Sequence, residues 1–382
     1  MKKILLLFMM CALLPRVAGA QGTPTDDTFT ISDLIADPDM GGYFFVVSLE
    51  GSRIYTAYNL DIFLPNGINV MYNEEDDVKT YYIVSTEDED FYPFTKVLNK
   101  KTFKHSVSGN VLAGNQVRVS CIAQDNSVFK ANSGTLFVVY VTIDESAFTS
   151  SFSPKPIVKL SGLNLTTKEA VKYVPADFAC RPFTTGIPTE RTLAVNVSST
   201  NKIGTLILPF NADLPTGLKA YSCNAIGDGD LLTLTPAASI EACTPYIVYA
   251  ENGYSGNLSG TATLSDDTNV TDVFTDGYLT GVLTTATTNT GYVLQNQGSG
   301  PMFYDTDGDT FSIPAGRCYL TPSASNNVKS FGFNFDTPTS IEDQLSNCQS
   351  SNCKLLYDLS GRRVESPTRG IYIQGTRKVV VK

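Results

Sequence analysis

The sequence predicts an all-β protein: two consecutive antiparallel β-sandwich or barrel domains, followed by a short C-terminal β module. Two observations predict this fold class. Residues that favour strands are frequent, including 19 Tyr and 21 Phe, although Trp is absent. Turn residues are also frequent, with 29 Gly and 19 Pro, and they separate short apolar segments. A chain of 382 residues is long enough for two or three such domains.

The first 20 residues have the pattern of a secretory signal peptide. A charged start precedes an apolar core that is too short to cross a bilayer, and small residues then fit a cleavage site. These residues are Lys2 and Lys3, the run 4–14, and Ala18, Gly19 and Ala20. Cys11 raises the alternative of a lipoprotein, but residues 8–10 make a poor lipobox. No later apolar run reaches about 18 residues, so we expect no transmembrane segment.

Residues 21–183 are predicted to form the first domain, an antiparallel sandwich of short strands without a helical period. Val117, Val119 and Cys121 alternate with polar residues, as in a half-buried strand. Residues 135–143 form the longest apolar run, and their Val content favours a core strand over a helix. Further strands are expected at residues 43–49, 58–64 and 80–85.

The order of these segments resembles that of cohesin-like domains of exported proteins. The matching segments are 58–68, 117–120, 132–137 and 157–165, within residues 28–180. In that family they are a strand leading into a turn, a middle strand, a core strand and the closing strand. The same superfamily of sandwiches contains carbohydrate-binding modules. The resemblance therefore implies a binding scaffold and no particular ligand.

Residues 184–190 are expected to be a linker, and residues 191–335 a second β domain. Residues 205–210 form its clearest early strand. The segment 240–247 (I-x-A-x-x-x-Y-I) is echoed by 313–320 (I-x-A-x-x-x-Y-L). The two segments are either equivalent strands of one barrel or sandwich, or a chance match at four positions.

A polar linker, residues 336–355, leads to residues 356–382, which resemble the C-terminal sorting domain of type IX (Por) secretion cargo. In that family a Y-D-x-x-G-R-x-V strand, a K/R-G-I-Y-I strand and a terminal K-x-V-V-x-K strand form a recognition module. The matching residues are Tyr357, Asp358, Gly361, Arg362, Val364, Gly370, Ile371, Tyr372, Lys378 and Lys382. The resemblance implies recognition by the outer-membrane translocon, export through the periplasm, and delivery to the cell surface or the medium.

Two acidic clusters are candidate calcium sites, because hard cations are held by several carboxylate oxygens. They are Glu74, Glu75, Asp76 and Asp77, and Glu87, Asp88, Glu89 and Asp90. Residues 78–86 between them are predicted to be one extended strand, which would separate the clusters by roughly 30 Å. That distance is too large for the paired carboxyls of a glycosidase. The alternative to a calcium site is two solvated loop tips.

The sequence predicts no catalytic residue and no cofactor other than calcium. His105 is the only histidine, is expected at the surface or in a turn, and has no accompanying G-x-S-x-G motif. The acidic segment 305–309 departs from an EF-hand loop at Gly308, so it is predicted to be a hairpin turn between 302–304 and 311–313. The candidates for stacking against a sugar are Tyr43, Tyr55, Tyr58, Tyr72, Tyr81, Tyr82 and Tyr92.

Charge and cysteine usage restrict the partners further. The net charge is −10, and removing residues 1–20 takes away three basic residues and no acid, which makes it −13. Such a chain repels phosphate backbones, so nucleic acid is excluded as an expected partner. The eight cysteines become seven without Cys11, and an odd number leaves a free thiol or an external partner. Cys348 and Cys353 are close enough in sequence to close a small loop.

The hypothesis that combines these observations is an exported, non-enzymatic binding or adhesion protein of the cell surface or medium. Its first domain would contact a glycan or a protein, through loops at one end of the sandwich or through a Tyr-bearing sheet face. Two alternatives stay open: a secreted hydrolase acting on extracellular polysaccharide or peptide, and a structural component of a surface layer.

Overall fold

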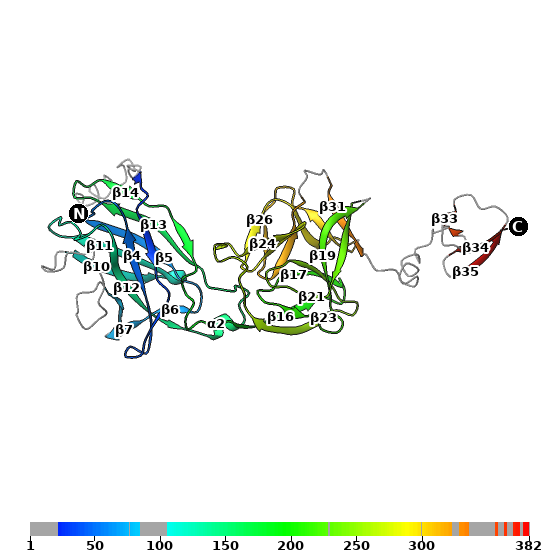
Figure 1. Ribbon diagram of the computed structural model, residues 1–382, viewed down its shortest axis with the longest axis horizontal. Helices are drawn as coiled ribbons and strands as arrows, with labels where there is room; N and C mark the ends of the chain where they lie inside the picture. Colours follow the sequence, from blue (N-terminus) through cyan, green and yellow to red (C-terminus); the bar gives the residue numbers. More distant parts are fainter. Residues whose placement is uncertain are drawn as a thin grey trace, which may run out of the picture.

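The structure is a computed structural model. Side chains are described for residues 22–75, 77–84, 105–227, 230–298, 300–322 and 328–335, and backbone alone for residues 356–357, 363–364, 370–374 and 377–381. The predicted fold class is confirmed, because nearly all regular structure is β and it is divided among several sheets (Figure 1). In the described part of the chain, no helix has the length and apolarity needed to cross a membrane.

Two sheets with a shared apolar core form the first unit, which we call the sandwich (residues 22–183). The first sheet contains, in spatial order, β1 (Thr23–Pro24), β14 (Lys172–Val174), β13 (Val158–Thr166), β5 (Ala57–Phe63), β11 (Gln116–Ala123) and β10 (His105–Leu112), with β15 (Phe178–Cys180) on β13. The second contains β2 (Thr28–Ile31), β4 (Gly42–Glu50), β12 (Gly134–Ile143) and β6 (Ile68–Val70), with β3 (Ile35–Asp37) on β4 and β9 (Ile83–Val84) on β12.

The residue pattern of each strand explains which face is buried. In β5, Tyr58, Leu60 and Ile62 are buried while the residues between them are more exposed, as expected for a half-buried strand. In β12 both faces are buried, so its sequence is continuously apolar instead of alternating. Val139 belongs to the central core, whereas Tyr140 packs in a second cluster on the outer side of the sheet.

The single strand predicted for residues 78–86 is wrong. The chain instead makes a hairpin of β7 (Tyr72–Glu75) and β8 (Val78–Tyr81), and then joins the second sheet as β9. The break falls at Tyr82, whose amide donates to Met71 O and whose carbonyl accepts from Tyr140 N. Tyr82 also packs against the Tyr140 ring, so covering the outer face of β12 outweighs continuing a straight strand.

A buried carboxylate fixes the loop that follows β4. Asp27 is 4% exposed and accepts hydrogen bonds from the Ser52 amide (2.7 Å) and the Tyr55 hydroxyl. Burial acts to raise the pKa of Asp27, but these donors, led by Tyr55, lower it on balance below the ordinary 3.8. The charged form of Asp27 therefore stabilises the folded sandwich.

Replacing Asp27 with asparagine is expected to lower the free energy of unfolding at pH 7 by about 1.5–3 kcal/mol, because hydrogen bonds to a charged acceptor are lost. The wild-type contribution should be full above the unfolded pKa, near 4, and should disappear as the pH falls through the lower folded pKa. Urea titrations at pH 7 and pH 3 measure both effects. Asp33→Asn, at an exposed carboxylate, should change little at either pH; equal losses in the two variants would contradict the assignment.

The second unit, which we call the barrel (residues 190–335), is built on a ten-stranded sheet. Its strands are, in spatial order, β17 (Ile203–Leu206), β22 (Tyr246–Tyr249), β19 (Lys219–Gly227), β20 (Leu231–Ala237), β31 (Ser330–Phe335), β28 (Pro301–Asp305), β27 (Tyr292–Asn296), β30 (Arg317–Leu320), β25 (Leu279–Val282) and β24 (Val273–Asp276). The sheet closes on itself because β30 also meets β17: Cys318 N donates to Thr205 Oγ1 at 3.0 Å, and Ile207 N to Gly316 O at 3.1 Å.

Three strand pairs cover the barrel. They are β16 (Glu190–Val197) with β23 (Tyr254–Thr261), β18 (Ala212–Asp213) with β21 (Ser239–Ile240), and β26 (Ala286–Thr288) with β29 (Phe311–Ile313). The strand predicted at residues 205–210 ends at Leu206. The next four residues are buried without joining a strand, since the carbonyls of Leu208 and Pro209 accept from the amides of Cys243 and Thr263 in loops.

The internal echo corresponds to a repeated topology. Segment 240–247 leaves β21, turns and enters β22, and segment 313–320 leaves β29, turns and enters β30. The strand pairing repeats as well. In the first half the pairs are β17 with β22, β18 with β21 and β19 with β20. The corresponding pairs in the second half are β25 with β30, β26 with β29 and β27 with β28. The structure therefore shows that the two segments are equivalent strands of one barrel and not a chance match.

A buried ion pair joins the two units. Arg181 of the sandwich and Asp272 of the barrel bind each other, with side chains only 1% and 0% exposed. Arg181 Nε also donates to the carbonyl of Asn269 at 3.0 Å, and Asp272 accepts from Ser153 Oγ at 2.9 Å. The two charges of the pair thus neutralise each other, and both side chains have further hydrogen-bond partners, as a buried pair requires.

Apolar contacts extend the same interface. Phe152, just after the short helix α2 (Ser146–Thr149), packs against two apolar clusters of the barrel. A Cβ on Gly316, where φ is +79°, would lie 2.2 Å from the Phe152 ring, so only glycine fits there. Ile187, within the segment expected as a linker, is buried in the sandwich core. Figure 1 shows α2 between the two units.

A third, small sheet lies at the C-terminus. It has the order β33 (Arg363–Val364), β32 (Leu356–Tyr357), β34 (Gly370–Gln374) and β35 (Arg377–Val381), with antiparallel pairing throughout. Its strands pair only with one another within the described residues.

Candidate functional site

The outer face of the first sheet forms an open, shallow hollow over β5, β11 and β13. Its volume is about 620 Å³. The bulge in β13 between Ser161 and Asn164 shapes this surface, because it interrupts the pairing with β5 and puts Gly162 at φ +62°. The lining residues are Ala57, Tyr58, Asn59, Asp61, Arg118, Ser120, Cys121, Ile122, Gly162, Asn164 and Thr166.

Paired strands arrange the outward side chains of this face in rows. Ser106 of β10 lies beside Ile122 of β11, and Asn110 beside Arg118. Continuing across the sheet, Arg118 lies beside Asp61 of β5. Because side chains of a strand alternate between faces, these residues share the surface opposite the core. We call this surface the sandwich face.

The charges in the middle of the sandwich face neutralise each other. Arg118 Nε and Nη2 lie 2.8 and 2.9 Å from the two carboxylate oxygens of Asp61. Hydrogen bonding from Arg118 lowers the pKa of Asp61 despite its partial burial, and raises that of Arg118. The pair is thus a fixed, neutral group at pH 7 that can still accept and donate hydrogen bonds to a ligand.

Amide and apolar groups surround this pair. The Nδ2 atoms of Asn59 and Asn164 donate to Gly162 O at 3.3 and 2.7 Å, so both amides are held in place. Ile122 is 59% exposed on the same face. An apolar side chain among oriented polar groups is typical of a binding surface, where it loses contact with water when a ligand binds.

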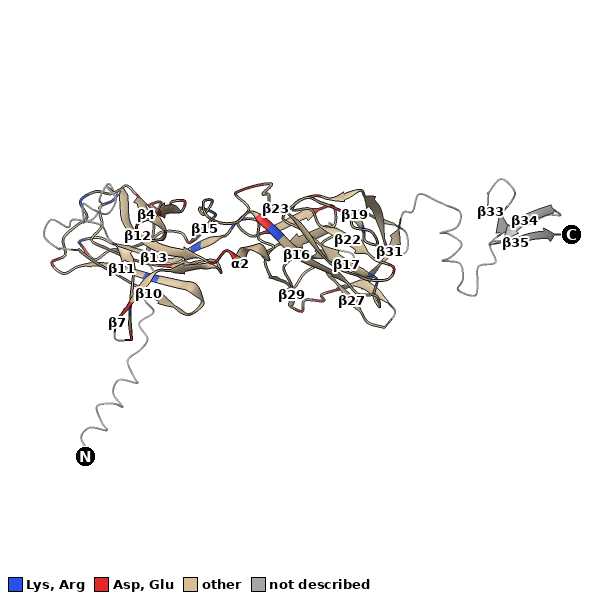
Figure 2. Ribbon diagram, turned by 90° about the horizontal axis from the view of Figure 1, so that it is seen from below, with Lys and Arg blue, Asp and Glu red and all other residues tan. Residues whose placement is uncertain are grey.

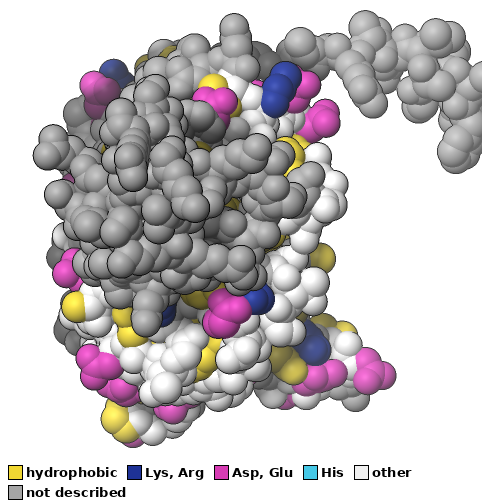
Figure 3. All heavy atoms as spheres, turned by 90° about the vertical axis from the view of Figure 1, so that its right-hand side faces the viewer, with side chains coloured by type: hydrophobic (Ala, Val, Ile, Leu, Met, Phe, Trp, Pro, Cys, Tyr) yellow, Lys and Arg dark blue, Asp and Glu magenta, His cyan; other side chains and the backbone are white. Residues whose placement is uncertain are grey.

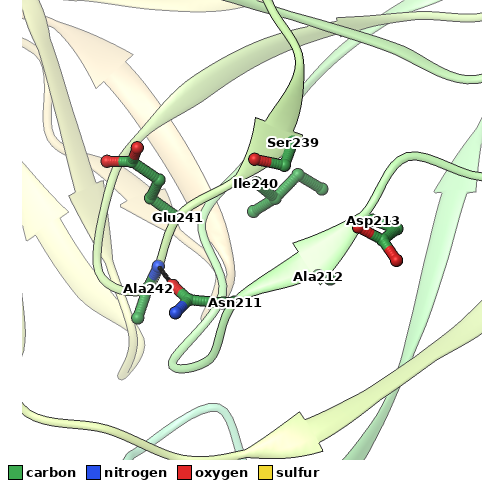
Figure 4. Close-up of a pocket in the computed structure, with 7 residues that line it drawn as sticks. All are labelled: Asn211, Ala212, Asp213, Ser239, Ile240, Glu241 and Ala242. Atoms are coloured by element: carbon green, nitrogen blue, oxygen red, sulfur yellow. Dashed lines mark hydrogen bonds between the residues drawn. The ribbon is translucent and has the colours of Figure 1, made fainter.

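A second hollow, of about 610 Å³, lies on the barrel beside β18 and β21. Asn211 Oδ1 accepts a hydrogen bond from Ala242 N at 2.7 Å and so joins its two sides. The carboxyl groups of Asp213 and Glu241 lie on opposite sides of the hollow and point apart (Figure 4). They do not form the facing pair that glycoside hydrolysis needs.

The structure places three of the four residues of the first predicted acidic cluster on the β7–β8 hairpin. Glu74 and Glu75 lie in β7 and Asp77 in its turn, and Figure 2 shows β7 projecting from the sandwich. Asp76 and the second cluster, residues 87–90, lie outside the described residues. Among the residues that are described, no three His, Cys, Asp or Glu side chains come together as metal ligands would. A calcium site stays a prediction.

Two predictions about single segments are wrong. His105 is 4% exposed, not at the surface: its Nε2 lies 3.0 Å from Ser127 O, and its ring packs against Phe129. The acidic segment 305–309 is not a hairpin turn, because β28 pairs with β27 and β31, whereas β29 pairs with β26. In both cases pairing between distant segments decides the outcome.

The tyrosines proposed for sugar stacking have different environments. The rings of Tyr55 and Tyr58 are buried in the core, so neither ring can stack against a sugar. Tyr72, 45% exposed, lies with Tyr81 on the β7–β8 hairpin, and the ammonium of Lys79 is 4.2 Å from the centre of its ring. Tyr92 lies outside the described residues. Sequence analysis did not predict the sandwich face, although the residues that alternate with the buried ones in β5 and β11 form it.

No disulfide joins the described cysteines, and most of them are buried. They are Cys121, Cys180, Cys223, Cys243 and Cys318. Burial raises the pKa of the Cys223 thiol to about 12 and that of Cys180 to about 11, which disfavours the reactive thiolate. Cys348 and Cys353 lie outside the described residues, as do the cleavage residues Ala18 and Ala20.

The predicted sorting residues fall only partly on described strands. Tyr357, Val364, Gly370, Ile371, Tyr372 and Lys378 lie in the C-terminal sheet. Asp358, Gly361, Arg362 and Lys382 lie outside the described residues.

No family model matches the chain, and no curated protein matches it. Among solved structures, the chain is similar to a type I cohesin in a cohesin–dockerin complex from Clostridium thermocellum, with 11% identity, a TM-score of 0.29 and coverage of 42% of this chain and 95% of that one. A non-cellulosomal cohesin from Archaeoglobus fulgidus shares 16% identity over 42% and 94% of the two chains, with a TM-score of 0.26.

The full-length major pilin SpaD from Corynebacterium diphtheriae shares 11% identity over 80% of this chain and 66% of that one, with a TM-score of 0.24. These scores are too low to assign the chain to a cohesin or pilin family. The β-sandwich is established by the sheets described above.

Proposed function

We propose that this protein is an exported, non-enzymatic binding or adhesion protein that contacts its ligand through the sandwich face. The neutral Arg118–Asp61 pair, held amides and an exposed Ile122 on one open sheet support this proposal. Each polar group is already fixed by a partner in the fold, so little conformational entropy is lost when a ligand binds.

A glycan is the ligand class that we favour for this face. Sugars present hydroxyls to planar amide and carboxylate groups and an apolar ring face to side chains such as Ile122, and the hollow offers both kinds of contact. A protein partner is the second candidate, which the exposure of Ile122 favours, because interfaces bury apolar side chains within a polar rim.

For delivery, we propose the type IX route inferred from the sequence. The leader would carry the chain into the periplasm, and residues 356–382 would be recognised by the outer-membrane translocon. The separate pairing of β32 to β35 supports a C-terminal module that can be recognised apart from the other two units. The proposed location is the cell surface or the medium.

A structural role in a surface layer is the alternative with its own support. The Arg181–Asp272 pair and the Phe152 contact join the sandwich and barrel through buried side chains. A rigid connection of this kind suits a protein that bears load or holds a binding face away from the cell.

Replacing Ile122 with arginine is expected to weaken ligand binding by about tenfold or more, because it replaces an exposed apolar side chain of the contact with a charge. The chain without residues 1–20, which we call the mature chain, is applied to a glycan array and to solubilised cell-envelope protein. Val78→Arg is the matched control: Val78 is 64% exposed but lies on the β7–β8 hairpin. Equal loss in both variants, or unchanged binding by the Ile122 variant, would contradict a contact at the sandwich face.

A further inference from the structure

A third hollow, of about 310 Å³, lies on the outside of the barrel where β17, β27, β29 and β30 meet. One wall is apolar, with Val293 and the partly buried ring of Phe311. The other groups are polar and include Gln295, Ser312 and Arg317. The hollow lies on the barrel and shares no residue with the sandwich face.

The charge of Arg317 has no counter-ion in the described part of the chain. Its Nη1 donates to the carbonyl of Thr205 at 2.9 Å and its Nη2 to that of Asn196 at 3.4 Å. No described carboxylate lies within 4.0 Å of the guanidinium, although the protein carries a net charge of −10. Two neutral carbonyls thus hold a cation whose other N–H donors remain for an anion.

Only the second half of the barrel repeat has an arginine at this position. When segment 312–320 is aligned with 239–247 through the internal echo, Arg317 occupies the position of Thr244. Pro314 occupies the position of Glu241, whose carboxyl lies at the acidic hollow in Figure 4. The same framework therefore carries a carboxylate in the first half and an unpaired guanidinium in the second.

We propose that this hollow binds a hexuronate residue of an acidic glycan. The sugar carboxylate accepts hydrogen bonds from Arg317, whose planar donors match a carboxylate. Phe311 contacts the apolar face of the ring, and Gln295 and Ser312 exchange hydrogen bonds with its hydroxyls. The combination of one cation and an apolar wall favours a carboxylate sugar over inorganic phosphate, which needs several donors and no apolar contact.

The test is calorimetric titration of the mature chain with trigalacturonate and with its fully methyl-esterified form, at two salt concentrations. We expect saturable binding of the acid, no binding of the ester, and weaker binding at high salt, because the contact is electrostatic. Ser312→Asp, which adds a carboxylate to the lining of the hollow without removing any contact of the Arg317 guanidinium, should weaken binding by about tenfold or more.

Ser239→Asp is the matched control, since Ser239 is the equivalent residue in the first half, and it should bind trigalacturonate like the wild type. Gln295→Glu adds a carboxylate to the same hollow from β27 and should act like Ser312→Asp. Thermal melts verify that all variants are folded. Equal binding of acid and ester, unchanged binding by both variants, or binding of an acidic peptide in place of trigalacturonate would overturn the proposal. The sandwich face is tested separately with the Ile122 variant.

Discussion

Replacing Arg181 with methionine is expected to lower the free energy of unfolding by about 3–5 kcal/mol. The substitution leaves Asp272, which is fully buried, without its cation, and removes the donors to the carbonyls of Lys155 and Asn269. An unpaired buried charge is far more costly than the pair itself is stabilising. Urea unfolding followed by tyrosine fluorescence and by circular dichroism measures the loss.

Two further variants separate the buried pair from a general effect of removing charge. Lys202→Met breaks an exposed ion pair with Glu251 and should lower the free energy of unfolding far less than Arg181→Met does. The double variant Arg181→Met with Asp272→Leu removes both buried charges and should recover part of the stability. A loss for Arg181→Met no larger than that for Lys202→Met would show that the ion pair does not hold the two units together.

Deleting residues 356–382 is expected to abolish delivery across the outer membrane and to leave the chain in the periplasm. The expectation follows from the resemblance of this segment to type IX sorting domains, whose recognition module is lost in the deletion. Because the described strands of this segment pair only with one another, the sandwich and barrel should stay folded. Immunodetection in periplasmic, surface and medium fractions measures the distribution.

The control for the deletion is Ile122→Arg, which alters the sandwich face and should be exported like the wild type. Protease resistance of the retained chain shows that it is folded. The truncated protein at the cell surface or in the medium, at wild-type abundance, would exclude the C-terminal segment as the sorting signal.

Much of the sandwich could be predicted from local patterns. Alternation in residues 117–121 indicated which side of β11 faces the core, and the apolar run 135–143 indicated a core strand. The same reasoning failed at Tyr82, where packing against Tyr140 divides one predicted strand between two sheets. The local sequence does not indicate this break, because the contact that causes it is made with a distant strand.

Long-range contacts also explain what the sequence did not predict about the sites. Arg181 and Asp272 are 91 residues apart, and neither stands out from its neighbours in sequence. His105 is buried because β10 and the segment around Phe129 enclose its ring. The internal echo aligns Arg317 with Thr244, but the two segments also differ at other positions, so the sequence alone did not single out this arginine.

The most direct test of the proposed function is photo-crosslinking from the sandwich face on living cells. A benzophenone amino acid replaces Ile122 in the mature chain and, as the control, Val78 on the β7–β8 hairpin. The proposed contact predicts that irradiation yields a specific, saturable adduct with one surface glycan or protein from position 122 and none from position 78. No adduct from position 122, or the same adducts from both positions, would contradict binding through the sandwich face.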